Sequence, residues 1–568
     1  MVNALIQPGQ DSDFALSGLS QRARLWLLTV TCFGVLVVIS SMMALNTALP
    51  DIATATLATQ TQLTWIVDSY TLALACLLLP AGALGDRFGR RGAMLVGLAI
   101  FGAASFVPAV LSDPTIVIVS RGVAGAGAAL IMPATLSLIT AAYSKEERNK
   151  AVGIWAGVAG SGAVIGMLGS GGLLSFWSWH AIFWAFATAA LTIFILTLTV
   201  ASSRDADAKP LDWRGALVIG GAVATLVFGI LEAPARGWTH PLVITSIGVG
   251  LLLGLAFGFV EVRQRYPLLD VRLFAVPAFA TGAATITVFF LSMFGYMFLL
   301  MQYMQMILGY SPNKTALALS PIMGPMLVLS VLSFWYLPRL GLRAVVFSGL
   351  LLIAIGVLCL LGVTSGSGYW RAAWPMLVMS VGIGLCTAPT TSVIMTTAPD
   401  DKQGVASAVN DASREIGAAL GIALAGSMLA AQYAKTLAPN LIGFPKPVSD
   451  AASTSLGEAL EVARRLGPAG ARLTEVSKTA FIDAMHSSLL VLGILIGVSA
   501  VVIGLWAPGR DDRQLRLVRY LLARRRSSQD PGTDQSASHR TGRGRQAVVA
   551  RVGVVSARPL RSSSSTAG

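Results

Sequence analysis

Charged side chains inside long apolar stretches are the residues of this 568-residue chain that could do chemistry. A charge in a bilayer is costly and usually marks function. Five such residues stand out: Asp68, Arg121, Asp411, Arg414 and Glu415. Asp411 and Glu415 are four residues apart, so a helix would place them on one face with Arg414 beside it. Two neighbouring carboxylates ionise less easily together, which suits proton exchange, but charged residues at 400–402 leave a solvated inner mouth as the alternative.

Asp68 and Arg121 lie in the second and fourth apolar stretches. Asp68 is about two helical turns from the outer side, and apolar walls there would disfavour its ionised form. It could therefore exchange a proton or hold a lipophilic cation, with an acid at a wet outer mouth as the alternative. A lone membrane arginine such as Arg121 needs a carboxylate or several backbone carbonyls as partners. A purely structural ion pair is the alternative for Arg121.

The composition sets the class of protein that must position these residues. The chain is 55% hydrophobic and only 12% charged, with a mean hydropathy of +0.71, which is typical of an all-α polytopic membrane protein. Its four cysteines lack CxxC spacing, and no GxxxxGK[ST], HExxH or GxSxG pattern occurs. We therefore expect no metal, no cofactor and no enzymatic activity.

About fourteen stretches are long enough to cross the hydrocarbon core, which takes roughly 20 residues per helix. The predicted spans are 26–48, 63–83, 92–111, 116–138, 151–173, 181–201, 214–233, 241–261, 277–300, 315–336, 344–364, 374–397, 405–431 and 487–507. Alternate short loops hold 15 Lys and Arg residues against three in the others. The positive-inside rule then predicts that both termini are cytoplasmic in a plasma (inner) membrane protein.

Three segments lie outside the spans. Residues 1–25 form a cytoplasmic N-terminal segment, and the basic tail 508–568 should be largely disordered. The start of the tail, "RQLRLVRYLLARRR", could lie as an amphipathic helix on anionic lipid; nucleic-acid binding is the rival and is not expected. The extracytoplasmic loop 432–486 is Pro- and Ser-rich at first and then helical in pattern. It is either a partial cover of the outer mouth or a tolerated linker.

The strongest short motif is "GALGDRFGRR" at 82–91, between the second and third spans. Gly82 would let a neighbouring helix approach closely, and Asp86 can face a helix N-terminus or an arginine across an interface. Contacts of this kind can form in one conformation and break in another. The residues expected to make such a conformational lock are Gly82, Asp86, Arg87, Gly89 and Arg90.

This motif resembles the loop signature of the major facilitator superfamily, and the resemblance extends over about 26–507. "WIVDSYTLALA" at 65–75 resembles the second helix of its fourteen-helix drug:proton antiporter family, which includes quaternary-ammonium and multidrug exporters. "RGVAGAGAALIMPATLSLI" from Arg121 resembles the fourth helix, and "SKEERNKAVGIWAG" the start of the fifth. "QYMQMILGYSPNKTALALSP" and "GVASAVNDASREIGAALGIA" resemble segments near helices nine to ten and thirteen.

The resemblance implies two six-helix bundles, 26–201 and 277–507, separated by an inserted helix pair within 202–276. Alternating access would operate around a site near the bilayer midplane. The resemblance also implies that Asp68 contributes to binding of cationic drugs and that Arg121 takes part in proton transfer. The loop at 337–343 is equivalent to the first-half motif but lacks its acid.

Two positions depart from the family pattern. Ser41 stands where drug-exporting relatives usually carry an aspartate, and a serine cannot carry a coupling proton. The antiporter-like packing motif has Met167 after Gly166 instead of proline, and Ser170 replaces a glycine; Gly162 completes the four-residue spacing. Candidate cavity-wall residues are Ser41, Asn46, Trp65 and Tyr70, with helix packing as the alternative.

The expected function is a secondary active transporter that exports amphipathic, cationic drug-like compounds in exchange for protons. Its partners would be a small amphipathic substrate, protons and membrane lipid, with anionic lipid at the basic tail. One alternative is export of a neutral or anionic lipid, siderophore or endogenous antibiotic. An alternative of another class is a non-transporting membrane scaffold or sensor that uses the tail to hold partners.

Overall fold

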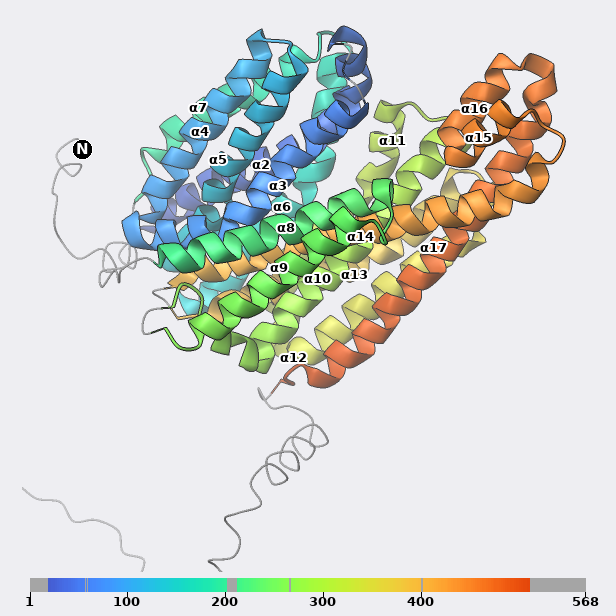
Figure 1. Ribbon diagram of the computed structural model, residues 1–568. Coiled ribbons are helices and arrows are strands. Elements are labelled where there is room, and N and C mark those ends of the chain that lie inside the picture. The colour runs from blue at the N-terminus through green and yellow to red at the C-terminus, as the bar shows by residue number, and fades with distance from the viewer. Residues whose placement is uncertain are drawn as a thin grey trace, which may run out of the picture. The chain divides into compact units, whose positions relative to one another are not determined.

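A computed structural model describes residues 19–56, 58, 60–201, 212–264, 267–399 and 402–510, and every regular element in these ranges is a helix (Figure 1). The long helices are α2 (Gln21–Thr56), α3 (Gln60–Phe88), α4 (Arg90–Val110), α5 (Pro114–Ala142), α6 (Lys145–Leu174), α7 (His180–Thr197), α8 (Trp213–Arg236), α9 (Pro241–Glu261), α10 (Pro277–Gln302), α12 (Met323–Cys359), α13 (Tyr369–Thr397), α14 (Gln403–Leu437) and α17 (Ala471–Trp506). Short helices include α11 (Pro312–Leu319), α15 (Lys446–Thr454) and α16 (Leu456–Arg465).

Thirteen stretches of the described chain are long and apolar enough to cross a membrane, and each of the fourteen predicted spans overlaps one of them. Two predicted spans, 315–336 and 344–364, share the single stretch Pro312–Gly362. Gly341, with φ 76°, interrupts the helical geometry of α12 between them. This left-handed backbone is open to glycine without strain. The prediction of an all-α polytopic membrane protein is confirmed.

For brevity, α2 to α7 are called the first half, α10 to α17 the second half, and α8 with α9 the inserted pair. Within the first half, α2 packs on α6 and α5 packs on both α3 and α4. Within the second half, α10 packs on α14 and α12 on α13. The two inserted helices pack on each other, and α8 also contacts α3 and α14; both run across the front of Figure 1. The division into two bundles stays a prediction.

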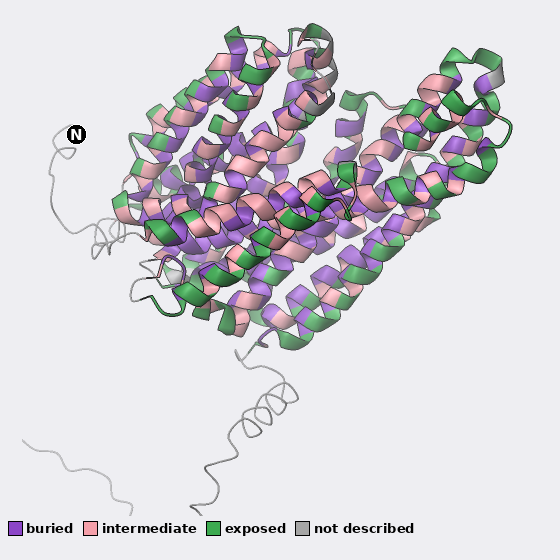
Figure 2. Cartoon of the chain, in the orientation of Figure 1, coloured by how far each residue is buried: buried purple, intermediate pink, exposed green. Residues whose placement is uncertain are grey.

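Buried and exposed residues are distributed as expected for helices in lipid. Figure 2 shows buried positions where helices face one another and exposed positions on the outer sides. The outward positions include large apolar residues, such as Leu252 and Leu255 of α9 at 68% and 73% exposure. Apolar side chains on the outside are stable in hydrocarbon but would be a liability in water.

The segment predicted as the loop 432–486 is mostly helical. α14 continues to Leu437 and α17 begins at Ala471, so both helices are longer than the predicted spans 405–431 and 487–507. The predicted spans are shorter than these helices because a span was defined by its apolar residues. Polar residues continue each helix beyond the span without breaking its backbone hydrogen bonds. The helical pattern predicted for "LGEALEVARRL" appears as α16.

Several predicted segments lie outside the described residues. They are most of the N-terminal segment (1–18), part of the loop before α8 (202–211) and the basic tail from 511, including its predicted amphipathic helix.

Candidate functional site

The predicted lock motif meets the N-terminus of α14. Asp86 Oδ1 accepts a hydrogen bond from Gly404 N at 2.9 Å, and Asp86 Oδ2 accepts one from Val405 N at 3.1 Å. A carboxylate is stabilised there because the first amides of a helix lack partners and carry partial positive charge. Arg90 Nη2 lies 3.1 Å from Asp86 Oδ1 on the same side. One acid from the first half thus holds the beginning of a second-half helix.

Close backbone contact accompanies this hydrogen bonding. A Cβ atom on Gly82 would lie 2.5 Å from Gly404 O, which is closer than real contacts allow. Gly89 has φ 107° and separates α3 from α4. The Arg87 guanidinium lies 5.3 Å from the centroid of the Phe88 ring. We call this end of the molecule the motif end; by the charge distribution of the loops it is the end expected to face the cytoplasm.

Two further contacts join the halves at the motif end. Ser392 of α13 donates a hydrogen bond to the side-chain oxygen of Asn149 in α6. Lys150 Nζ of α6 lies 5.9 Å from the Phe334 ring of α12. Together with the Asp86 contacts, they hold the halves together at this end, so the described conformation has a closed motif end.

Arg121 is buried in the first half and is held by neutral groups. Its Nη1 donates to Ser41 Oγ at 2.8 Å, its Nη2 to Ser41 O at 3.3 Å, and its Nε to Ile66 O at 3.2 Å. The guanidinium also lies 4.1 Å from the Tyr70 ring, while Tyr70 donates its hydroxyl to Val38 O at 3.0 Å. The sequence predicts either a carboxylate or backbone carbonyls as partners of Arg121. Among the described residues the partners are two carbonyls and a hydroxyl, so Arg121 forms no ion pair there.

A second buried cluster lies on α14. Asp411 is 0% exposed, and Arg414 and Glu415 are each 4% exposed, so the alternative of a solvated inner mouth does not fit. Arg414 Nη1 lies 3.9 Å from Asp411 Oδ1, and Asn410 donates to the same oxygen at 3.0 Å. Arg414 Nη2 also donates to Thr391 Oγ1 of α13 at 3.3 Å. Arg414 can balance only one negative charge, so the cluster carries an excess negative charge when Asp411 and Glu415 are both ionised.

Unsatisfied polar atoms gather in this α14 cluster. Asp411 Oδ2, Glu415 Oε2 and Arg414 Nε are buried without a hydrogen-bond partner in the described part of the chain. Buried polar atoms normally have partners, and each exception calls for an explanation such as a functional role or a missing ligand. A carboxyl group that binds a proton or a cation in one step of a transport cycle has released it in another step. In that second step one of its oxygens is left without a partner.

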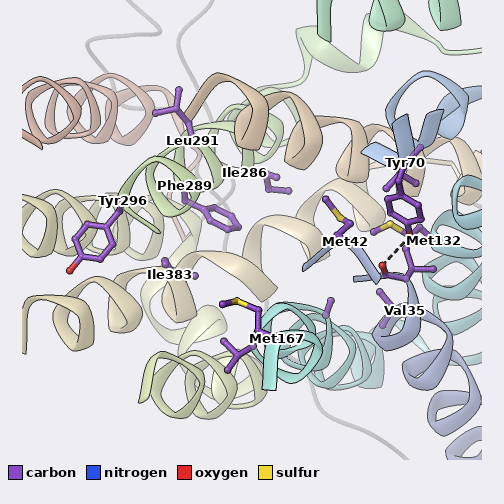
Figure 3. Packing of buried hydrophobic residues seen from close by; sticks show 14 of the residues in the cluster. Val35, Met42, Tyr70, Met132, Met167, Ile286, Phe289, Leu291, Tyr296 and Ile383 are labelled. Atoms are coloured by element: carbon purple, nitrogen blue, oxygen red, sulfur yellow. Dashed lines mark hydrogen bonds between the residues drawn. The ribbon is translucent and has the colours of Figure 1, made fainter. Parts of the chain in front are cut away.

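The α14 cluster borders a cavity between the two halves. The lining comes from α2, α5 and α6 on one side and α10, α12, α13 and α14 on the other: Ile39, Met42, Met43, Met132, Ala156, Ala159, Gly160, Ala163, Phe289, Phe290, Met293, Phe294, Met326, Ile383, Thr387, Arg414, Glu415 and Ala418. Figure 3 shows four of them, Met42, Met132, Phe289 and Ile383, in the buried packing around this region. Among the described lining residues Glu415 is the only acid, five are methionine and three are phenylalanine.

The predicted cavity-wall residues are not in this lining. Ser41 points to Arg121, whereas the next two residues of α2, Met42 and Met43, face the cavity, because consecutive helical residues point in different directions. Tyr70 is buried beside Arg121. The side chain of Asn46 lies outside what the structure describes.

Trp65 and Asp68 face the inserted pair instead. The Trp65 ring stacks on Phe228 of α8, with ring centroids 6.0 Å apart. Asp68 is half-buried, and the carboxylate of Glu232 in α8 is its electrostatic neighbour. Glu232 itself pairs with Arg236. Asp68 is therefore not among the described residues that line the cavity with Glu415, although the sequence analysis groups the two as substrate and proton residues.

The glycines of α6 bring that helix close to α2. A Cβ on Gly166 would lie 2.4 Å from Ser40 O, and one on Gly162 would lie 2.9 Å from Ile39 Cβ. Met167 is buried in the hydrophobic core, and Ser170 donates its hydroxyl back to Met167 O at 3.0 Å. The predicted close packing at this spacing is present without the proline of the family pattern.

Sequence reasoning missed Trp155 and the methionines that line the cavity from three helices. Trp155 lies against Arg414, with its ring centroid 5.0 Å from the guanidinium. A tryptophan inside a glycine-rich span was the available signal for Trp155. Nothing in the sequence indicates that Met42, Met132 and Met326, from three helices, share one wall, because helical periodicity identifies a face but not its neighbour.

The comparisons with known proteins bear on this geometry. Residues 31–422 match the family described as the Major Facilitator Superfamily. The chain belongs to the Major Facilitator Superfamily. The fold agrees with this, since a solved superfamily structure, a proton:xylose symporter XylE, matches 89% of this chain and 100% of its own at TM-score 0.56 and 14% identity. The protein is thus an integral membrane transporter rather than an enzyme.

Several curated relatives are drug-resistance proteins. Multidrug resistance protein Stp of Mycobacterium tuberculosis is 31% identical over 75% of this chain and 80% of its own length. Methyl viologen resistance protein SmvA of Salmonella typhimurium is 31% identical over 81% and 93%. The tetracenomycin C resistance and export protein of Streptomyces glaucescens is 28% identical over 85% and 91%.

Proposed function

We propose that this transporter exports amphipathic, cationic drug-like compounds in exchange for protons. The observation that carries the proposal is the cavity between the halves, where Glu415 is the one acid that the structure describes in a lining rich in methionine and phenylalanine. Flexible thioethers adapt to ligands of many shapes, and aromatic faces attract cations. The names of the curated relatives, which include multidrug and methyl viologen resistance proteins, support this substrate class.

Competition at Glu415 would couple the two fluxes. A proton and a cationic substrate both neutralise a buried carboxylate, so each lowers the site's affinity for the other. Asp411 and Arg414 set the charge around Glu415 from one helical turn of α14. Protonation from one side of the membrane then releases the substrate that entered from the other.

The lock at the motif end would select which side of the cavity is open. Asp86 and the α14 amides hold the halves together at this end in the described conformation. Because Glu415 also lies on α14, a movement of this helix connects the cavity to the lock. We propose that release of Asp86 from Gly404 and Val405 opens the cytoplasmic side.

Arg121 and Asp68 take secondary roles in this proposal. Arg121 braces α2 and α3 through Ser41 and Ile66 and has no described carboxylate whose proton it could control. Asp68 lies beside Glu232 at the interface with the inserted pair, away from the cavity lining. We propose that Asp68 attracts cations near the outer side without carrying the coupling proton.

Export of a neutral or anionic compound is a second candidate, which Arg414 in the same cavity wall favours. An anionic cargo would pair with the guanidinium, and protonation of Glu415 would remove the competing negative charge. A relative named as a tetracenomycin C resistance and export protein supports export of one specific compound.

Transport by the purified protein in vesicles separates these candidates. An imposed proton gradient should drive accumulation of a lipophilic cationic dye, and addition of that dye should in turn release protons. A neutral dye and an anionic dye of similar size are the comparison substrates, and an ionophore that collapses the gradient is the control. Proton-dependent transport of the anionic dye alone would favour the second candidate, and dye movement that ignores the gradient would contradict both.

A further inference from the structure

A groove separate from the cavity lies between α12 and α17 at their motif ends. Its walls are Leu340, Arg343, Ala344 and Phe347 from α12, and Val501, Gly504, Leu505, Gly509 and Arg510 from α17 and the turn after it. The groove opens outward, where Val501 and Leu505 are 50% and 48% exposed. It therefore faces the lipid rather than the transport path.

Two features of the backbone create the groove. Gly341, with φ 76°, bends the chain between the two parts of α12, and a Cβ there would lie 2.7 Å from Arg510 N. Gly504 lets α17 approach Phe347, since a Cβ at this position would lie 2.9 Å from the Phe347 ring. The chain after α17 thus passes directly over the bend in α12.

The charged residues of the groove share one sign. Arg343 and Arg510 are two of its described lining residues, and none of the described lining residues is acidic. Arg343 is positioned by its Nε, which donates to Ala507 O at 2.9 Å, and its backbone N donates to Pro508 O at 3.1 Å. Arg510 is exposed at the end of the described chain.

The surroundings place the arginines at the membrane surface. Trp335, six residues before the bend at Gly341, is 55% exposed, and Trp506 at the end of α17 is 43% exposed. Tryptophans are enriched where hydrocarbon meets headgroups. Arg339 lies over the Trp335 ring at 4.6 Å, which adds a third arginine at this level. Phosphate-sized negative charge can therefore meet the arginines while acyl chains lie along the apolar wall.

We propose that this groove binds an anionic phospholipid from the membrane leaflet at the motif end. The lipid phosphate lies between Arg343 and Arg510, and an acyl chain runs along Phe347, Val501 and Leu505. Charge complementarity identifies the occupant, because guanidinium groups bind phosphate and basic pockets between membrane helices suit anionic headgroups. Because α12 and α17 belong to the second half, a bound lipid steadies that half against the membrane.

A photo-crosslinkable phosphatidylglycerol, diluted into phosphatidylethanolamine nanodiscs holding the full chain, tests the site. Crosslinks are expected in peptides containing residues 340–347 or 501–510. Arg510→Gln should lower their yield about fivefold, the effect of one arginine near a charged surface. Val501→Trp should lower it without changing charge, by filling the groove. Arg214→Gln, at an exposed position at the motif end of α8, is the matched control and should leave the yield unchanged.

Three results would overturn the proposal. Crosslinks confined to residues 511–568 would show that the basic tail, not the groove, meets the lipid. Equal crosslinking by a phosphatidylethanolamine probe would remove the charge selectivity. Equal yields in the Arg510→Gln, Val501→Trp and Arg214→Gln variants would show that no defined site exists.

Discussion

Arg121 in the first half and Arg414 in the second half are both buried arginines, but their partners differ. Arg121 donates to a serine and to carbonyl oxygens, all of them neutral. Arg414 lies between two acids of its own helix, and that cluster retains buried polar atoms without partners. Only the second cluster contains groups that can take up a proton, and only the second borders the cavity.

The difference locates the titratable chemistry in one half of a two-part molecule. Arg121 meets the hydroxyl of Ser41, which cannot carry a coupling proton, and no described carboxylate takes its place in the first cluster. Neutral partners make the first cluster a brace. In the proposed cycle, the α14 cluster provides both the site for cations and the site for protons.

Among the changes that leave Glu415 in place, Asp411→Asn should have the largest effect. This change removes one of two acids beside Arg414 and leaves the guanidinium with Glu415 as its main partner, so Arg414 competes more strongly with a cation for the Glu415 carboxylate. Gradient-driven efflux of a lipophilic cation should fall about tenfold, within the range of coupling energies between linked ligands. Vesicle uptake assays measure it, with the exposed Asp483→Asn as the matched control. Normal efflux in Asp411→Asn would show that Asp411 of the second half takes no part in transport.

Arg121→Met should have a moderate effect, on stability more than on coupling. Removal of Arg121 leaves only neutral hydrogen-bond acceptors without a donor, so the free energy of unfolding should fall by about 1–3 kcal/mol. Removal of one partner of a buried ion pair would lower it by about 3–5 kcal/mol. The thermal unfolding temperature in detergent should fall, while the pH dependence of the remaining efflux stays the same. Arg371→Met, at an exposed position, is the control. Loss of the pH dependence would show that Arg121 meets a carboxylate during the cycle.

Particular residues show how much the sequence could predict. Every predicted span overlaps a described apolar stretch, because a bilayer imposes length and hydropathy on each crossing. The position of Asp86 at a helix N-terminus also agrees with one of the two predicted settings. By contrast, the direction of Asp68 toward Glu232 and the pairing of Ser41 with Arg121 depend on which helices become neighbours. Helical periodicity contains no information about that choice.

Ser41→Asp would sharpen the comparison with a smaller effect. The new carboxylate would stand within hydrogen-bond reach of Arg121, whose Nη1 lies 2.8 Å from Ser41 Oγ. Arg121 should keep it ionised, so thermal stability should change by no more than about 2 kcal/mol and coupling should stay with the second half. Combining Ser41→Asp with Glu415→Gln should therefore not restore proton-driven efflux. Restoration would mean that the first half needs only an acid to carry the coupling.

Asp68→Asn should have the smallest effect. Asp68 is partly exposed and outside the cavity lining, so its electrostatic contribution to cation binding should be worth about 0–1 kcal/mol, or up to about fivefold in apparent affinity. Transport assays over a range of dye concentrations should show a higher half-saturating concentration with an unchanged response to the proton gradient. Loss of that response would place the coupling proton on Asp68 instead of α14.

Substrate-induced proton release from vesicles containing Glu415→Gln tests the central claim most directly. Wild-type protein should release protons when a lipophilic cation is added, and so should Glu475→Gln, which changes an acid in the outer part of α17. Glu415→Gln should release no protons when the cation is added, although the folded protein is recovered in normal amounts. Proton release at the wild-type level from Glu415→Gln would contradict the central claim.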